Sequence, residues 1–194
     1  LKTIGRKHTA QQFFDAFALA RKCGFDNINT DLIAGLPTDT PESFKNSLDS
    51  IVRLNAECIT VHTLCMKRAS RLTTEGVTLD LQQARDAREM LAYTQNILGQ
   101  NEYIPYYMYR QSRMVGNLEN VGWSKKGFES LYNVYVMDET HTILACGSGG
   151  VTKLKRNNPD YLERIFNFKY PYEYIDRFDE LIQRKSGIMQ FYGQ

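Results

Sequence analysis

Two short apolar segments with one helical segment between them constrain the fold more than any other feature of the sequence. Residues 27–34 are rich in apolar side chains and end at a Gly-Leu-Pro turn, which predicts a buried strand. Thr40 followed by Pro41 is typical of a helix start, and apolar residues follow at helical spacing until about Asn55. Residues 58–65 are rich in β-branched residues and predict a second strand. A strand, a helix and a strand joined by such short links form a parallel βαβ unit, so we expect part of an α/β sheet or barrel.

Further helices and strands are expected on both sides of this unit. Thr9 and Gln12 form a capping-box pattern for a helix that stops near Gly24. Beyond the second strand we expect a long helix at residues 78–99 and a strand at residues 103–110. A hairpin is expected at residues 132–146, with its turn at 138–140. An aromatic loop at residues 170–174 and a closing helix at residues 178–182 are expected to follow. No internal repeat and no linker-like segment interrupts this order.

Composition narrows the class of protein. With 194 residues, of which 42% are hydrophobic, the chain is long enough for one ordinary globular domain with a real core. The net charge is only +2 and no block of Lys and Arg occurs, so nothing indicates a nucleic-acid partner. No apolar run approaches the roughly 20 residues of a membrane span, and residues 1–10 lack the apolar region of a signal peptide. We therefore expect a cytoplasmic protein with no membrane partner.

The cysteines do not follow a metal-binding pattern. Cys23, Cys58, Cys65 and Cys146 occur without CxxC or CxxxCxxC spacing, so the spacing encodes neither a zinc site nor an iron–sulfur site. A chain this long and this poor in cysteine does not indicate a disulfide framework either. The three histidines are scattered, and we expect them to pack and to form hydrogen bonds.

Two other segments invite a ligand but have simpler explanations. The sequence ACGSGGVT at residues 145–152 lacks both the GxGxxG spacing of a dinucleotide site and the GK[ST] of a phosphate loop. Tight backbone packing is therefore the favoured role of its glycines. The aromatic side chains of residues 103–109 could stack on a flat ligand, although a half-buried strand is the favoured explanation.

One carboxylate stands out in the first predicted strand. Asp31 lies directly before Leu32 and Ile33, and an unpaired carboxylate buried in such a segment would cost several kcal/mol. Asp31 is therefore expected either to face a wet cavity or to have a partner.

Several stretches resemble one known family. They are GRKHT at residues 5–9, GFDNINTDLIAGLPTDTPESF at residues 24–44, YRQSRMVGNLENVGW at residues 109–123 and the glycine segment at residues 146–151. Together they are similar to the radical S-adenosylmethionine (SAM) enzymes of the oxygen-independent coproporphyrinogen III oxidase family, in its coproporphyrinogen dehydrogenase-like branch. The resemblance covers nearly the whole chain.

The resemblance implies a fold and a division of the chain. The family has a partial (β/α)₆ barrel, of which residues 1–75 would supply the last βα units and residues 76–194 the family's C-terminal elements. The family's cluster motif CxxxCxxC and its glycine-rich segment for the methionine part of SAM are absent from this sequence. We therefore expect a C-terminal fragment of a longer enzyme that cannot hold the 4Fe–4S cluster by itself.

The resemblance also implies four cofactor-binding residues. Asp31 matches an aspartate that contacts SAM in the family, and Arg6 matches a family arginine. A carboxylate suits ribose hydroxyls or a cationic ligand, whereas a guanidinium suits a carboxylate. Cys65 is expected to contact the ligand through its backbone, and Val151 to pack against the adenosine. The alternative for Asp31 and Arg6 is an internal ion pair that only ties the strand to the preceding turn.

Two functions remain open at this point. The first is an oxidoreductase of porphyrin and haem biosynthesis, which uses SAM and a 4Fe–4S cluster to convert coproporphyrinogen III to protoporphyrinogen IX by oxidative decarboxylation. The isolated fragment would be inactive, with no catalytic residue and no metal ligand of its own. The second is a haem-binding chaperone of the same family. Self-association of the fragment is a further expectation, because the strand at residues 28–34 would lack one neighbour.

Overall fold

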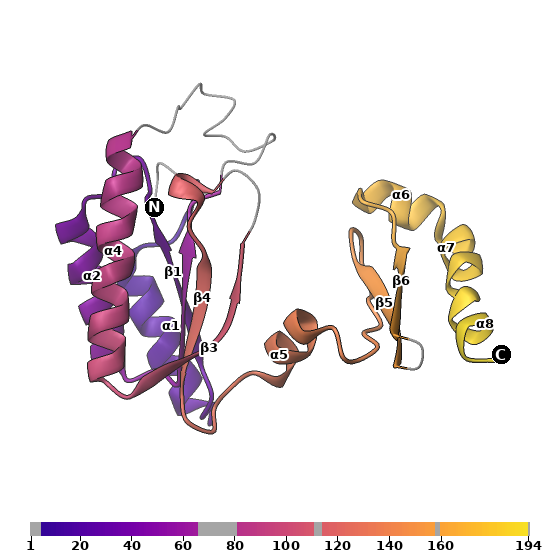
Figure 1. The fold of residues 1–194 in the computed structure, drawn as a ribbon, viewed down its shortest axis with the longest axis horizontal. Helices are drawn as coiled ribbons and strands as arrows, with labels where there is room; N and C mark the ends of the chain where they lie inside the picture. Colours follow the sequence, from indigo (N-terminus) through magenta and orange to yellow (C-terminus); the bar gives the residue numbers. More distant parts are fainter. Residues whose placement is uncertain (1–4, 66–80, 111–113, 158–159, 194) are drawn as a thin grey trace. The chain divides into compact units, whose positions relative to one another are not determined.

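The computed structural model describes residues 5–65, 81–110, 114–157 and 160–193. The chain divides into two compact units, Leu1–Ser130 and Leu131–Gln194, and each has its own elements (Figure 1). The boundary expected at residue 75 refers to elements of the family and stays a prediction.

The first unit contains a four-stranded mixed sheet. Its strands are β1 (Asn29–Ala34), β2 (Cys58–Thr63), β3 (Tyr103–Tyr109) and β4 (Asn120–Lys125), in the order β1-β2-β4-β3. The strands β1 and β2 are parallel and are joined through helix α2 (Pro41–Leu54), which confirms the predicted βαβ unit. Strand β4 pairs antiparallel with both β2 and β3. The fold is therefore mixed α/β, and β1 is an edge strand of the described sheet.

Local signals in the sequence explain where the helices begin and end. Helix α1 (Ala10–Lys22) starts with the predicted capping box, in which the Thr9 side chain and the Gln12 side chain each bond to the other residue's backbone N–H. Thr40 caps α2 by accepting a hydrogen bond from Ser43 N at 3.2 Å. Asn55 ends α2 in the left-handed conformation, with φ 57°.

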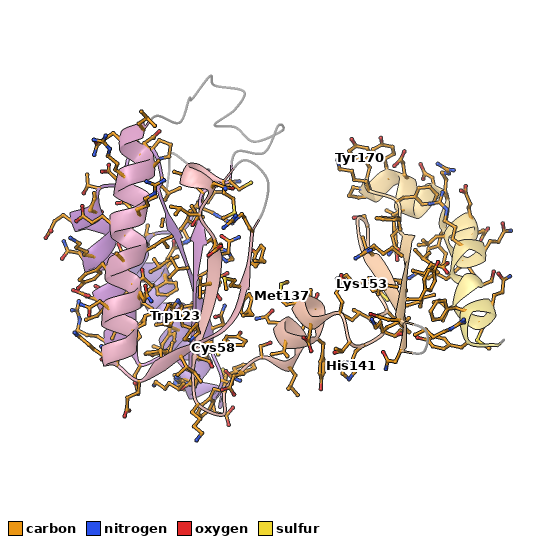
Figure 2. All side chains as sticks on the ribbon, viewed as in Figure 1. Cys58, Trp123, Met137, His141, Lys153 and Tyr170 are labelled. Carbon is orange, nitrogen blue, oxygen red and sulfur yellow. The ribbon has the colours of Figure 1, made fainter. Side chains whose placement is uncertain are left out.

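The helices cover one face of the sheet. Helices α1, α2 and α4 (Leu81–Gln100) lie together on the same side of the sheet in Figure 1. The core between them and the sheet includes Phe44, Leu48, Ile59, Val61, Met90, Leu98 and Trp123, the last labelled in Figure 2. Because side chains alternate along a strand, the opposite face of β1 and β2 carries a different set of residues, most of which are polar.

The second unit is built around an antiparallel pair of strands, β5 (Val151–Asn157) and β6 (Asp160–Phe166). Its described residues also form the helices α5 (Leu131–Asp138), α6 (Pro171–Asp176), α7 (Phe178–Lys185) and α8 (Gly187–Tyr192). Its core includes Leu154, Ile165 and Phe191. Lys153 of β5, labelled in Figure 2, bonds to Glu139 at 2.7 Å and so ties β5 to the residue after α5.

Two sequence-based predictions for this unit are wrong. The hairpin expected at residues 132–146 is instead helix α5 followed by a segment that forms an isolated bridge with β5, between Ile143 and Lys153, but no strand. The aromatic loop expected at residues 170–174 is largely helix α6. Strand propensity at residues 131–138 did not decide the structure, because a strand also needs a partner and β5 pairs with β6.

The remaining expectations for element types are confirmed within about two residues, except that the closing helix α7 ends three residues after the expected residue 182 and that residues 78–80 fall outside the described part of the chain. No helix among the described residues is long and apolar enough to span a membrane.

Candidate functional site

The open face of the first sheet carries a cluster of polar and aromatic side chains, which we call the polar face. Its members are Asn29, Asp31, Thr60, His62, Tyr107 and Tyr109, from β1, β2 and β3. In the parallel register Asp31 lies opposite Thr60, and Ile33 lies opposite His62. The alternation of side chains along β2 explains why Thr60 and His62 belong to the polar face. Ile59 and Val61 lie in the core below the helices, so Thr60 and His62 point to the opposite face.

A bulge in β3 brings two tyrosines to the same face. Tyr103 is in the core on the helix side, but the register shifts between Pro105 and Tyr107. After the shift, Tyr107 lies opposite Gly122 and Tyr109 opposite Asn120. The bulge therefore moves the odd-numbered residues of β3 from the helix side to the polar face.

Gly122 makes room for the first of these rings. A Cβ atom at this glycine would lie 1.8 Å from Cε1 of Tyr107, which no real side chain could do. The rings of Tyr107 and Tyr109 are parallel within 6°, with their centroids 6.3 Å apart. Burial raises the pKa of both phenols, so both stay protonated at neutral pH.

The sequence context of Asp31 predicted that this carboxylate either faces a wet cavity or has a partner, and the structure shows an exposed side chain that also has a partner. Its side chain is 60% exposed, and His62 Nε2 lies 3.7 Å from its Oδ2 atom. Asn29 Nδ2 donates a hydrogen bond to Asp31 Oδ1 at 2.7 Å. The neighbouring His62 side chain is the main reason why the pKa of Asp31 is lowered, while partial burial acts in the opposite sense. The carboxylate is therefore charged at neutral pH.

A cavity of about 690 Å³ opens beside this carboxylate. Arg6, Asp31 and His62 all contribute to its lining. This volume is within the range of about 300 to 1,000 Å³ that is typical of small-molecule sites. The cavity combines a carboxylate, a guanidinium and an imidazole, which can bind hydroxyls, cations and carboxylates.

The structure brings together two of the four predicted site residues. Arg6 and Asp31 line the same cavity, but no ion pair joins them, and the ionic partner of Asp31 among the described side chains is His62. Cys65 follows β2 and forms a bridge with Met114 in the same unit. Val151 begins β5 in the other unit, so its contact with a shared ligand stays a prediction.

The sequence analysis expected His62 to pack and to form hydrogen bonds, and it favoured a half-buried strand for Tyr107 and Tyr109, so it did not place these three residues in the site. The alternation of CITVHTLC could have placed Thr60 and His62 on the face opposite Ile59 and Val61. The tyrosines could not be placed in this way, because the bulge in β3 interrupts the alternation.

The described cysteines do not fit an iron–sulfur cluster. No three His, Cys, Asp or Glu side chains come together as a metal site in the described part of the chain. Cys58 is buried and lies 3.1 Å from the carbonyl oxygen of Phe128. Burial raises the pKa of its thiol to about 11, whereas a cluster ligand must be a thiolate. We therefore assign none of the described residues to a cluster.

Comparisons with known proteins identify several relatives. No protein-family model matches the chain. The chain is 37% identical over 190 residues to the oxygen-independent coproporphyrinogen-III oxidase-like protein HemZ of Bacillus subtilis. This alignment covers 98% of this chain and 38% of HemZ. The chain is 31% identical over 167 residues to the heme chaperone HemW of Lactococcus lactis, which covers 81% of this chain and 40% of that protein. The chain thus spans about two fifths of the length of these relatives.

The fold resembles one solved structure. That structure is coproporphyrinogen III oxidase (HemN) from Escherichia coli, a radical SAM enzyme. The match has a TM-score of 0.63 and 18% sequence identity, and it covers 92% of this chain and 40% of that one.

Proposed function

Because the chain belongs to the oxygen-independent coproporphyrinogen III oxidase-like family of radical SAM proteins, we propose that its polar face forms part of a SAM-binding site. The whole protein is proposed to be an oxidoreductase that converts coproporphyrinogen III to protoporphyrinogen IX by oxidative decarboxylation. The observation that carries this proposal is the shared cavity of Arg6 and Asp31.

The residues of the cavity suit the chemistry of SAM. Asp31 is a charged carboxylate that can accept hydrogen bonds from ribose hydroxyls or attract the sulfonium cation. Arg6 has a guanidinium that can bind the carboxylate of the methionine part. SAM that accepts one electron from a cluster held by another part of the protein would supply a radical able to abstract hydrogen, and these side chains would hold and orient it.

The architecture supports the proposed barrel. Parallel β1 and β2 with helices on one face are what the outer wall of a partial (β/α)₆ barrel requires, and the polar face would then line its interior. In the proposal, residues 1–75 supply the last βα units, and the cluster ligands belong to a part of the protein outside this chain.

A second function is favoured by a different observation. The match to heme chaperone HemW covers 81% of this chain, and the parallel rings of Tyr107 and Tyr109 offer a surface for a flat macrocycle. Haem binding without decarboxylation is therefore the alternative for the whole protein.

One experiment separates the two functions. The full-length protein, with its cluster reconstituted, is incubated without oxygen with SAM, coproporphyrinogen III, a one-electron reductant for the cluster and an electron acceptor for the substrate radical, and protoporphyrinogen IX and 5′-deoxyadenosine are measured. We expect both products from the full-length protein and neither from the 194-residue chain. Stoichiometric haem binding in an absorbance titration, together with no decarboxylation, would instead support the chaperone. Turnover by the 194-residue chain alone would contradict the assignment of the cluster to another segment.

A further inference from the structure

One row of residues crosses all four strands of the first sheet on the polar face. Asp31 of β1 lies opposite Thr60 of β2, and Thr60 lies opposite Gly122 of β4. Gly122 in turn lies opposite Tyr107 of β3. Because Gly122 has no side chain, the ring of Tyr107 lies over β4, and its Oη atom comes within 3.2 Å of Thr60 Oγ1. The row therefore connects β3, at one edge of the sheet, with β1, at the other.

The hydrogen bonds along this row have a fixed direction. A charged carboxylate can only accept hydrogen bonds, so the contact of 2.7 Å between Asn29 Nδ2 and Asp31 Oδ1 is donated by the amide. This orientation leaves Asn29 Oδ1 as an acceptor, and Thr60 Oγ1 donates to it at 3.0 Å. A hydroxyl has one hydrogen, so the bond between Thr60 and Tyr107 must be donated by Tyr107. The hydrogen bonds thus run from the phenol of Tyr107 to the carboxylate of Asp31.

The two oxygen atoms of Asp31 differ in their surroundings. Oδ1 accepts the bond from Asn29, which is held by Thr60, a side chain that is only 1% exposed. Among the described side chains, the ionic partner of Oδ2 is His62, whose Nε2 atom lies 3.7 Å away, too far for a hydrogen bond. Asn29 and Asp31 both line the cavity of about 690 Å³. The row therefore holds Oδ1 and leaves Oδ2 to accept a hydrogen bond from a ligand.

We propose that Asn29 is a positioning residue that fixes the carboxylate of Asp31 so that its Oδ2 atom faces the ligand of the cavity. Thr60 and Tyr107 act through Asn29, because they hold the acceptor end of its amide. The inference rests on the proposed function, because it concerns the ligand of that same cavity. A carboxylate that is already fixed loses less conformational freedom when the ligand binds, so each bond of the row contributes to affinity.

The first test needs no ligand and measures the pKa of Asp31. The neighbouring His62 side chain is the main cause of the lowered pKa of Asp31, and partial burial opposes it. Hydrogen bonds from Asn29 and Thr60 lower the pKa further. Removing the amide in Asn29→Ala should therefore raise the pKa of Asp31. Aspartate labelled with ¹³C at the side-chain carboxyl carbon reports the titration midpoint by NMR, and Asp31→Asn identifies the resonance.

Asp15 provides an internal control for this titration. It is an exposed carboxylate that also accepts a bond from a side-chain amide, because Gln11 Nε2 donates to Asp15 Oδ1 at 2.8 Å. We expect the midpoint of Asp31 to be higher in Asn29→Ala than in the wild type, while that of Asp15 stays the same. An unchanged midpoint of Asp31 would overturn the inference.

The second test measures SAM affinity by calorimetry in the full-length protein with its cluster reconstituted. Thr60→Val keeps the shape of the side chain but removes the hydroxyl that holds Asn29, whereas Thr60→Ser keeps the hydroxyl and removes a methyl group. We expect affinity to fall about three- to tenfold in Thr60→Val and to stay within about twofold of the wild type in Thr60→Ser. Equal affinities of these two variants would overturn the inference, because the hydroxyl would then not matter for the ligand.

The phenol at the start of the row is tested in the same way. Tyr107→Phe removes the hydroxyl that holds Thr60, and we expect affinity to fall about two- to fivefold. The control Tyr93→Phe removes a phenol hydroxyl that donates to Asp49 at 2.7 Å, between α4 and α2, and should leave affinity unchanged. Equal affinities of the two variants would contradict the role given to Tyr107.

A double-mutant cycle shows whether Asn29 acts through Asp31. We expect Asn29→Ala to weaken SAM binding about three- to tenfold in the wild type and to cause no further loss in Asp31→Ala. An equal loss in both backgrounds would overturn the inference, because Asn29 would then act independently of Asp31. Weaker binding in Asp31→Ala with unchanged binding in Asn29→Ala would overturn this inference alone, whereas no SAM binding by the wild type would overturn the proposed function as well.

Discussion

At the scale of residues, the ion pair of Arg21 and Glu57 is expected to contribute clearly to the stability of the first unit. Arg21 Nη2 donates to both oxygens of Glu57, at 2.6 and 2.7 Å, and Ile28 N donates to Glu57 Oε2 at 3.1 Å. One carboxylate thus joins the last turn of α1, the residue before β1 and the residue before β2. Only 11% of the Glu57 side chain is exposed. Removing its charge would leave Arg21 without a charged partner, with only the carbonyl oxygens of Phe25 and Asn55 as acceptors.

Glu57→Gln is expected to lower the free energy of unfolding by about 1 to 2 kcal/mol at pH 7. Burial alone would raise the pKa of Glu57, but the hydrogen bonds from Arg21 and Ile28 lower it overall. A lowered pKa stabilises the fold above the unfolded value of about 4.3 and ceases to do so as the pH falls through the folded value. The difference between wild type and variant should therefore shrink from pH 5 to pH 3 in urea titrations.

The control for this prediction is Glu89→Gln. Glu89 pairs with Lys45 at 2.7 Å, but its side chain is 56% exposed, so we expect a change within about 0.5 kcal/mol. Equal losses in the two variants at pH 7 would contradict the role given to Glu57.

At the scale of elements, the open edge of β1 has a measurable consequence. Among the described residues β1 pairs only with β2, and the carbonyl oxygens of Ile28 and Ala34 bond toward β2. The backbone groups of Asn29, Asp31 and Ile33 therefore point to the free edge. Such an edge pairs readily with another chain.

We expect the 194-residue chain to form dimers or larger species. Size-exclusion chromatography with light scattering over a dilution series measures this directly. A monomer at high concentration would contradict this prediction and would show that the edge of β1 is protected.

Elements determined by local sequence were predictable, whereas elements that depend on distant partners were not. The capping box at Thr9, the Pro41 helix start and the βαβ order are local signals, and all are present in the structure. Strand β4 was not predicted, because it forms by pairing with β2 and β3 from separate parts of the chain. In the candidate site, Asp31 was found from its unusual place in an apolar strand. His62 and Tyr109 matter through a contact between strands, which a single sequence does not specify.

At the scale of the whole molecule, the site residues are divided between two units. Arg6, Asp31 and Cys65 lie in the first unit and Val151 in the second. The resemblance assigned all four to one ligand, and the structure brings Arg6 and Asp31 to one cavity. Because the chain spans about two fifths of its relatives' length, the complete ligand site is proposed to form in the whole protein.

The most direct test of the central claim measures SAM affinity and melting temperature of Asp31→Asn in the full-length protein, with Asp15→Asn as control. Loss of a charge-assisted hydrogen bond is worth about 1.5 to 3 kcal/mol, so we expect affinity to weaken about tenfold or more. The side chain of Asp31 is 60% exposed, so the melting temperature without ligand should hardly change. The control should retain the affinity of the wild type. Unchanged affinity together with a lowered melting temperature would contradict the account, because Asp31 would then stabilise the fold and not bind the ligand.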